Sequence, residues 1–156
     1  MDCFELRQWD GFKKAGGDAS RPAIIDQVAI DSRRIHAGSA LFAALKGETT
    51  DGHAFINEAA AAGARFVLAR KSWNTEFEHP SAQMLRVADP LAALQQIAAA
   101  YRSSLRCRTI AIAGSFGKTM VKDLLLKMLH SPLSVVASPE SFNSQIGVPL
   151  SLFTIC

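Results

Sequence analysis

The feature that most restricts the fold of this 156-residue chain is a glycine-containing turn between an apolar run and an amphipathic run. Residues 109–113 read as a short buried strand, and residues 114–119 then read GSFGKT. Apolar side chains follow at helical spacing: Val121, Leu124, Leu125, Met128 and Leu129. The order strand, glycine loop, helix is typical of a loop that binds phosphate groups.

The chemistry of this turn suits a nucleotide polyphosphate. Phosphate oxygens need inward-facing backbone N–H groups, which Gly114 and Gly117 can supply because no Cβ stands in the way. Lys118 is expected to reach the outer phosphates and to act in catalysis, and the Thr119 hydroxyl is expected to ligate Mg²⁺. The predicted ATP-binding residues in the turn are Gly114, Ser115, Phe116, Gly117, Lys118, Thr119 and Met120.

The loop departs from the full GxxxxGK[ST] pattern, because Ile112 stands where that pattern has its first glycine. The match is therefore to a shortened version, GxxGKT. An alternative is that the two glycines only make a tight turn between a strand and a helix, with Lys118 and Thr119 in solvent.

Upstream of the turn, the hydrophobic pattern indicates an α/β layer. Apolar runs of strand length occupy residues 27–30, 40–45, 65–69 and 84–87, and helical spacing occupies residues 54–62. Asp89 and Pro90 then suit the start of an alanine-rich helix. Strands that alternate with helices favour a parallel sheet.

Composition restricts the class of function. The net charge is +3, with basic residues scattered rather than clustered, so no nucleic-acid partner is expected. The three cysteines are far apart and lack metal-ligand spacing. The first residues contain no apolar signal segment, and no apolar run is long enough to cross a bilayer. We therefore expect a cytoplasmic protein without a membrane span.

Three ordered motifs resemble those of the Mur ligase family, which also includes folylpolyglutamate and cyanophycin synthetases. The first is the shortened phosphate loop. The second covers residues 31–64, with DSR, then LFAALKG, then DGHAF and GA. The third, SFNSQIGVPLSL at residues 141–152, is similar to a segment of the branch that adds D-alanyl-D-alanine. This branch usually has Gly-Asn where Glu140 and Ser141 stand and a second asparagine where Ser144 stands, so two amide side chains are replaced.

The resemblance also implies site residues. Within it, Asn143 is a candidate for a contact near the phosphates. The positions that match the pocket for the uridine diphosphate end of the substrate are Ser32, Arg33, Lys46, Gly47, Asp51, Gly52 and His53. Judged singly, Asp31 and Asp51 are also common turn formers, and His53 is also compatible with a helix start or a surface position.

The fold that the resemblance implies is a small α/β substrate domain in residues 1–87, followed by the start of a P-loop ATPase domain with an incomplete parallel sheet in residues 88–156. In the implied reaction, ATP phosphorylates the terminal carboxylate of UDP-N-acetylmuramoyl-tripeptide. The amine of D-alanyl-D-alanine then attacks the acyl phosphate to form an amide, ADP and phosphate. ATP and Mg²⁺ are the implied cofactors, and the full enzyme is expected to be a monomer.

Residue 156 comes early in the ATPase domain of such a ligase, so we expect the 156-residue chain by itself not to complete ligation. The nearest alternative is the ligase that adds the third peptide residue. A second is a non-catalytic module that binds a UDP-sugar or nucleotide, and a third is an unrelated P-loop NTPase. An unpaired sheet edge would also favour aggregation or dimerisation of the isolated chain.

Overall fold

The computed structural model describes residues 4–20, 22–36, 38–73, 77, 79–131, 133–139, 142 and 144–155. Within them the chain forms β-strands, α-helices and short 3₁₀ helices (η). In chain order these are β1 (Phe4–Glu5), η1 (Leu6–Gln8), η2 (Lys13–Ala15), β2 (Ile24–Ile25), β3 (Gln27–Ala29), η3 (Ser32–Arg34), β4 (Ala40–Ala43), η4 (Gly52–Phe55), α1 (Ile56–Ala61), β5 (Ala64–Arg70), β6 (Gln83–Val87), α2 (Pro90–Ser104), α3 (Lys118–Leu129) and α4 (Gly147–Leu152).

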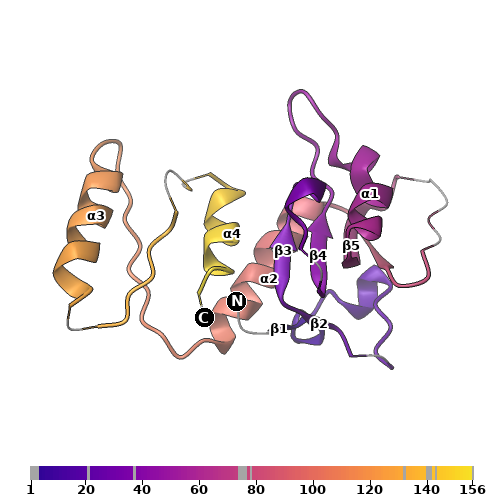
Figure 1. The fold of residues 1–156 in the computed structure, drawn as a ribbon, viewed down its shortest axis with the longest axis horizontal. Helices are drawn as coiled ribbons and strands as arrows, with labels where there is room; N and C mark the ends of the chain where they lie inside the picture. Colours follow the sequence, from indigo (N-terminus) through magenta and orange to yellow (C-terminus); the bar gives the residue numbers. More distant parts are fainter. Residues whose placement is uncertain are drawn as a thin grey trace.

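The main sheet of the fold is parallel, with the order β3-β4-β5-β6, and Figure 1 shows β3, β4 and β5 side by side. All four strands and the helix predicted after β4 are confirmed, with bounds that differ by one to two residues for most ends. The predicted helix begins as η4 and continues as α1. An antiparallel pair of short strands, β1 and β2, joins Phe4 to Ile25 and was not apparent from the hydrophobic pattern.

The two faces of the sheet are covered by different helices, because successive strand side chains point to opposite faces. On one face, Leu41 and Leu68 pack with Leu94 and Ile97 of α2 and with the aromatic residues of the N-terminal segment. On the other face, a second cluster packs against α1; its members include Phe42, Val67, Ile56 and Ala59. The chain therefore forms a three-layer α/β fold.

Helix α2 starts as predicted and connects the sheet to the C-terminal part of the chain. The Asp89 carboxylate accepts hydrogen bonds from the backbone N–H groups of the first turn, at 2.9 Å from Leu91 and 3.3 Å from Ala92. Near the other end of the helix, Tyr101 stacks on Phe153, with ring centroids 5.4 Å apart. Helix α4 thus packs beside α2 rather than beside α3 (Figure 1).

The strand predicted at residues 109–113 is absent, so that prediction is wrong. The part of the chain described after α2 contains α3 and α4 but no strand. A parallel strand depends on neighbouring strands for its hydrogen bonds, and none of the strands in the sheet pairs with this segment. Ile110 is accordingly 63% exposed. The apolar pattern of the segment is real, but pairing decides whether it becomes a strand.

Candidate substrate and nucleotide sites

Two loops that carry predicted substrate residues leave the same edge of the parallel sheet. Helix η3 follows β3, and the loop at residues 44–51 follows β4 and leads into η4. Because parallel strands share the direction of their carboxyl ends, both loops meet at one edge, where ligands bind in open α/β sheets. The structure thereby brings to one edge all seven predicted substrate residues: Ser32, Arg33, Lys46, Gly47, Asp51, Gly52 and His53.

The first loop is organised by Asp31. Its carboxylate accepts hydrogen bonds from the Arg33 backbone N–H at 3.1 Å, from Arg33 Nε at 2.9 Å and from Nη2 at 2.9 Å. The side-chain hydrogen bond from Arg33, followed by the backbone one, lowers the pKa of Asp31 to about 2. Asp31 is thus the N-cap of η3, as its turn-forming character suggested. Ser32 is 5% exposed, and its side chain makes no hydrogen bond with the described residues.

The second loop is closed by its own backbone. Lys46 and Asp51 form an isolated antiparallel bridge, and the Gly47 N–H donates to the Thr50 carbonyl at 2.9 Å. The Gly52 N–H donates to the Leu45 carbonyl at 2.8 Å. A Cβ on Gly52 would lie 2.7 Å from that oxygen, so this position needs glycine for close approach. The closed loop leaves the Lys46 side chain exposed at the edge of the sheet.

His53 lies in the interior, 7% exposed, rather than on the surface. Its Nδ1 lies 2.6 Å from Asp51 Oδ1, and its Nε2 accepts the Arg70 backbone N–H at 3.0 Å. The backbone N–H of His53 also donates to Asp51 Oδ1 at 3.0 Å, which makes Asp51 the N-cap of η4. The backbone hydrogen bond and then the ring hydrogen bond lower the pKa of Asp51.

The glycine loop leads directly into helix α3, but the segment before the loop is not a strand. Gly117 is the N-cap of α3 and has φ 78°, a left-handed conformation that favours glycine. The Lys118 Nζ folds back over the loop and donates to the Gly114 carbonyl at 2.5 Å. Thr119 is exposed, so its hydroxyl is accessible at the first turn of a 12-residue helix.

The rest of the predicted nucleotide site is open to solvent. Phe116 is 96% exposed and Met120 is 77% exposed. None of the residues of α3 is buried, and the partly exposed Lys122 donates to the Ser138 carbonyl at 3.2 Å. Asn143, the remaining ATP-binding candidate, lies outside the described residues.

The structure does not bring the two predicted sites together. Helix α3 lies at one end of the long axis of the molecule, and α1, which follows the substrate loops, lies at the other end (Figure 1). Helices α2 and α4 lie between them (Figure 1). In this chain the glycine loop and the carboxyl edge of the sheet are therefore separate sites.

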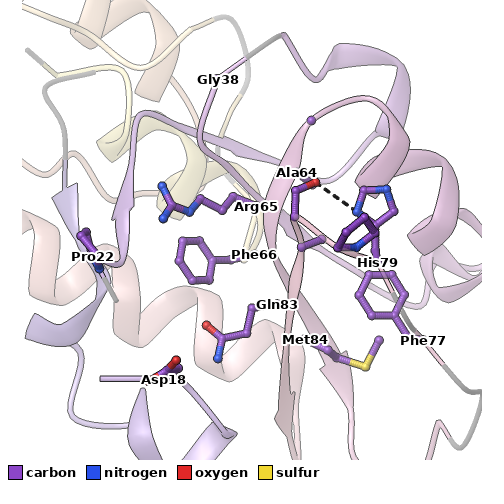
Figure 2. A pocket seen from close by; sticks show the side chains of 14 residues that line it. Asp18, Pro22, Gly38, Ala64, Arg65, Phe66, Phe77, His79, Gln83 and Met84 are labelled. Carbon is purple, nitrogen blue, oxygen red and sulfur yellow. Dashed lines mark hydrogen bonds between the residues drawn. The ribbon is translucent and has the colours of Figure 1, made fainter. Parts of the chain in front are cut away.

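A cavity that the sequence did not predict lies at the opposite edge of the sheet. It has a volume of about 1040 Å³ and is lined by residues around the amino ends of β5 and β6. Figure 2 shows Arg65, Phe66 and Gln83 at this cavity, with Phe77 and His79 across from them. The Arg65 guanidinium carbon lies 5.9 Å from the centroid of the Phe66 ring. None of the predicted site residues lines this cavity.

Among the described residues, no group of three or more His, Cys, Asp or Glu side chains could hold a metal ion. The hydroxyl of Thr119 is an oxygen donor of the kind that Mg²⁺ prefers, and Mg²⁺ at nucleotide sites takes other ligands from phosphate and water. Within the described part of the chain, none of the helices combines the length and apolar character that crossing a bilayer demands.

Curated proteins of similar sequence share one name. The chain is 37% identical over 134 residues to the UDP-N-acetylmuramoyl-tripeptide--D-alanyl-D-alanine ligase of Bacillus subtilis and 33% identical over 131 residues to that of Escherichia coli. These matches cover 85% and 84% of this chain. The chain spans 28% of the length of each of these curated relatives.

Solved structures show the same likeness. MurF from Acinetobacter baumannii superposes with a TM-score of 0.81 at 26% identity, over 100% of this chain and 34% of that one. A MurF ligase from Thermotoga maritima in complex with ADP superposes with a TM-score of 0.70 at 27% identity, over 81% of this chain and 28% of that one. The model of the Mur ligase family, catalytic domain, matches residues 24–102. With the parallel sheet and its carboxyl-edge loops, this match shows that the chain belongs to the Mur ligase family.

Proposed function

We propose that this chain supplies the UDP-binding domain and the phosphate loop of an ATP-dependent ligase that joins D-alanyl-D-alanine to UDP-N-acetylmuramoyl-tripeptide. In this proposal, residues 1–87 form the substrate domain and residues 88–156 begin the ATP-binding domain. The reaction is the one that the names of the curated relatives describe. The single observation that carries the proposal is that both substrate loops meet at the carboxyl edge of the parallel sheet.

The chemistry of that edge supports binding of the uridine diphosphate end. The Ser32 hydroxyl makes no hydrogen bond with the described residues and is not itself enclosed, so it can bond to a polar ligand group. The exposed Lys46 ammonium can neutralise a diphosphate oxygen. Arg33 is largely committed to Asp31 through two guanidinium nitrogens, so we expect it to contribute mainly by shaping the loop.

The glycine loop supports a role in phosphoryl transfer. In the proposed reaction the γ-phosphoryl group passes to the substrate carboxylate and ADP leaves; the amine then attacks the acyl carbon and phosphate leaves. Lys118 would exchange the Gly114 carbonyl for phosphate oxygens, which its three N–H donors favour. The N-terminus of α3 adds a favourable site for negative charge. Thr119 would hold Mg²⁺, which neutralises phosphate charge when bound.

The substrates of this reaction also suggest the setting in which the protein works. ATP and UDP-linked precursors are cytosolic metabolites, so we place the protein in the cytoplasm. We expect the complete ligase to be a monomer, since the candidate substrate loops belong to a single chain. Light scattering of the complete ligase tests the second expectation, and a stable dimer would contradict it.

The test is calorimetric titration of the purified chain with UDP and, separately, with ATP and Mg²⁺. We expect saturable binding of UDP that Lys46→Ala weakens about 10- to 100-fold, the range for loss of a hydrogen bond to a charged group. Lys118→Ala should weaken ATP binding and leave UDP binding unchanged. Lys14→Ala, which removes an exposed lysine in η2, is the matched control. Equal effects of the Lys14 and Lys46 substitutions on UDP binding would contradict the proposal.

A second candidate function is a UDP-sugar-binding module without ligase activity. It is favoured by the contrast between a packed substrate edge and a glycine loop that has no strand behind it. UDP binding without ATP binding, and no amide formation from the full set of substrates, would favour this module over the ligase.

A further inference from the structure

At the substrate edge, His53 links the loop that follows β4 to the end of β5, 17 residues later. The Asp51 carboxylate lies 2.6 Å from His53 Nδ1, and the Arg70 backbone N–H donates to His53 Nε2 at 3.0 Å. Asp51 closes the loop that follows β4, whereas Arg70 is the last residue of β5. A single imidazole therefore ties the substrate loop to the end of the neighbouring strand.

The partners of the ring determine where its proton lies. A backbone N–H can only donate, so Nε2 must carry a lone pair and accept. Nδ1 faces a carboxylate, which only accepts when ionised, so the proton lies on Nδ1. His53 is thus a neutral imidazole with both nitrogens in use, and at 7% exposure it has no nitrogen left for a ligand.

The surroundings of the ring hold it in this orientation. The Trp73 ring lies against it, with centroids 6.0 Å apart and planes tilted by 40°. Arg86 of β6 in turn donates from Nη1 to the Trp73 carbonyl at 2.6 Å. The carboxyl ends of β4, β5 and β6 are therefore joined through His53 and Trp73.

We propose that His53 is a positioning residue for UDP binding: its Nδ1–H holds Asp51, and thereby the 46–51 loop, in place against the end of β5 without touching the ligand. This inference rests on the proposed function, because the 46–51 loop is taken as part of the UDP site. It assigns His53 a different role from that of Ser32 and Lys46, which are the groups available to contact UDP.

Two variants separate the hydrogen bond of His53 to Asp51 from its hydrogen bond with the Arg70 N–H. His53→Asn keeps an N–H donor near the position of Nδ1 and loses the acceptor for Arg70. His53→Gln keeps an acceptor near the position of Nε2 and loses the donor to Asp51. The Kd for UDP, measured by calorimetry, should stay within about 3-fold of the wild type for Asn and rise about 10- to 100-fold for Gln, since only Gln releases the loop. His36→Gln, at an exposed histidine, is the control.

A spectroscopic measurement tests the tie independently of UDP. In the ligand-free protein labelled with ¹⁵N-histidine, long-range ¹H–¹⁵N correlations should show the Nδ1–H tautomer for His53, and the Arg70 amide should exchange slowly. The Nε2–H tautomer would overturn the inference, and so would equal Kd values for the Asn and Gln variants when the wild type binds UDP. Failure of the wild type to bind UDP would instead overturn the proposed function, and the inference with it.

Discussion

Replacement of Gly52 by alanine is expected to destabilise the chain and displace the substrate loop. The new Cβ would lie 2.7 Å from the Leu45 carbonyl oxygen and 2.8 Å from the Leu45 nitrogen, and both are backbone atoms at the end of the strand region. Relief of these contacts requires a backbone shift, which breaks the 2.8 Å hydrogen bond from the Gly52 N–H. Overpacking and loss of one buried hydrogen bond together cost about 2–4 kcal/mol.

The assay for Gly52→Ala is urea unfolding followed by tryptophan fluorescence, together with UDP titration of the folded protein. A cost of this size leaves a typical domain folded, because native stabilities are about 5–15 kcal/mol. The UDP Kd should therefore rise by at least about 10-fold in a protein that still unfolds cooperatively. Gly47→Ala, whose Cβ would lie 3.1 Å from the Thr50 carbonyl, is the control for unfolding and should cost less. Equal unfolding free energies for the Gly52 variant and the wild type would refute the reasoning.

Three further predictions concern packing and charge. Tyr101→Phe removes the hydroxyl that donates to the Ile155 carbonyl at 2.5 Å. We expect the free energy of unfolding to fall by about 1 kcal/mol and the C-terminal segment to be cleaved faster by a protease. An unchanged rate of proteolysis would contradict this prediction. Leu94→Ala, at a fully buried site, should cost about 2–5 kcal/mol in urea unfolding, whereas Leu124→Ala, 57% exposed, should change stability by less than about 0.5 kcal/mol; similar losses would contradict the packing. Asp31 has a pKa lowered from 3.8 to about 2, so its contribution is present above pH 3.8 and is lost as the pH falls through about 2. In Asp31→Asn, the free energy of unfolding should fall less steeply with decreasing pH in that range. An unchanged pH dependence of the unfolding free energy would contradict the assignment.

The sequence by itself determined the α/β class and most of the sheet. The spacing of apolar residues can be read from a short stretch of sequence. The strands at residues 40–45 and 65–69 could therefore be predicted from runs of apolar residues. The cap of α2 could also be predicted, because an aspartate followed by proline satisfies the first N–H groups of a helix without any distant partner. The motifs at residues 31–64 indicated the family, and the match at residues 24–102 confirms it.

Only the tertiary structure decided which site residues bond to neighbouring residues and which are available to contact a ligand. His53 lies at a helix start, in η4, as the sequence suggested, but it is buried rather than on the surface, because the Arg70 N–H, 17 residues later, faces its ring. The sequence places Arg33 in the substrate pocket, but its pairing with Asp31 depends on the turn that η3 makes. Residues 109–113 have the apolar pattern of a strand, yet none of the strands in the sheet pairs with them. In each case the outcome depends on a partner group brought close by folding, and local sequence does not specify that partner.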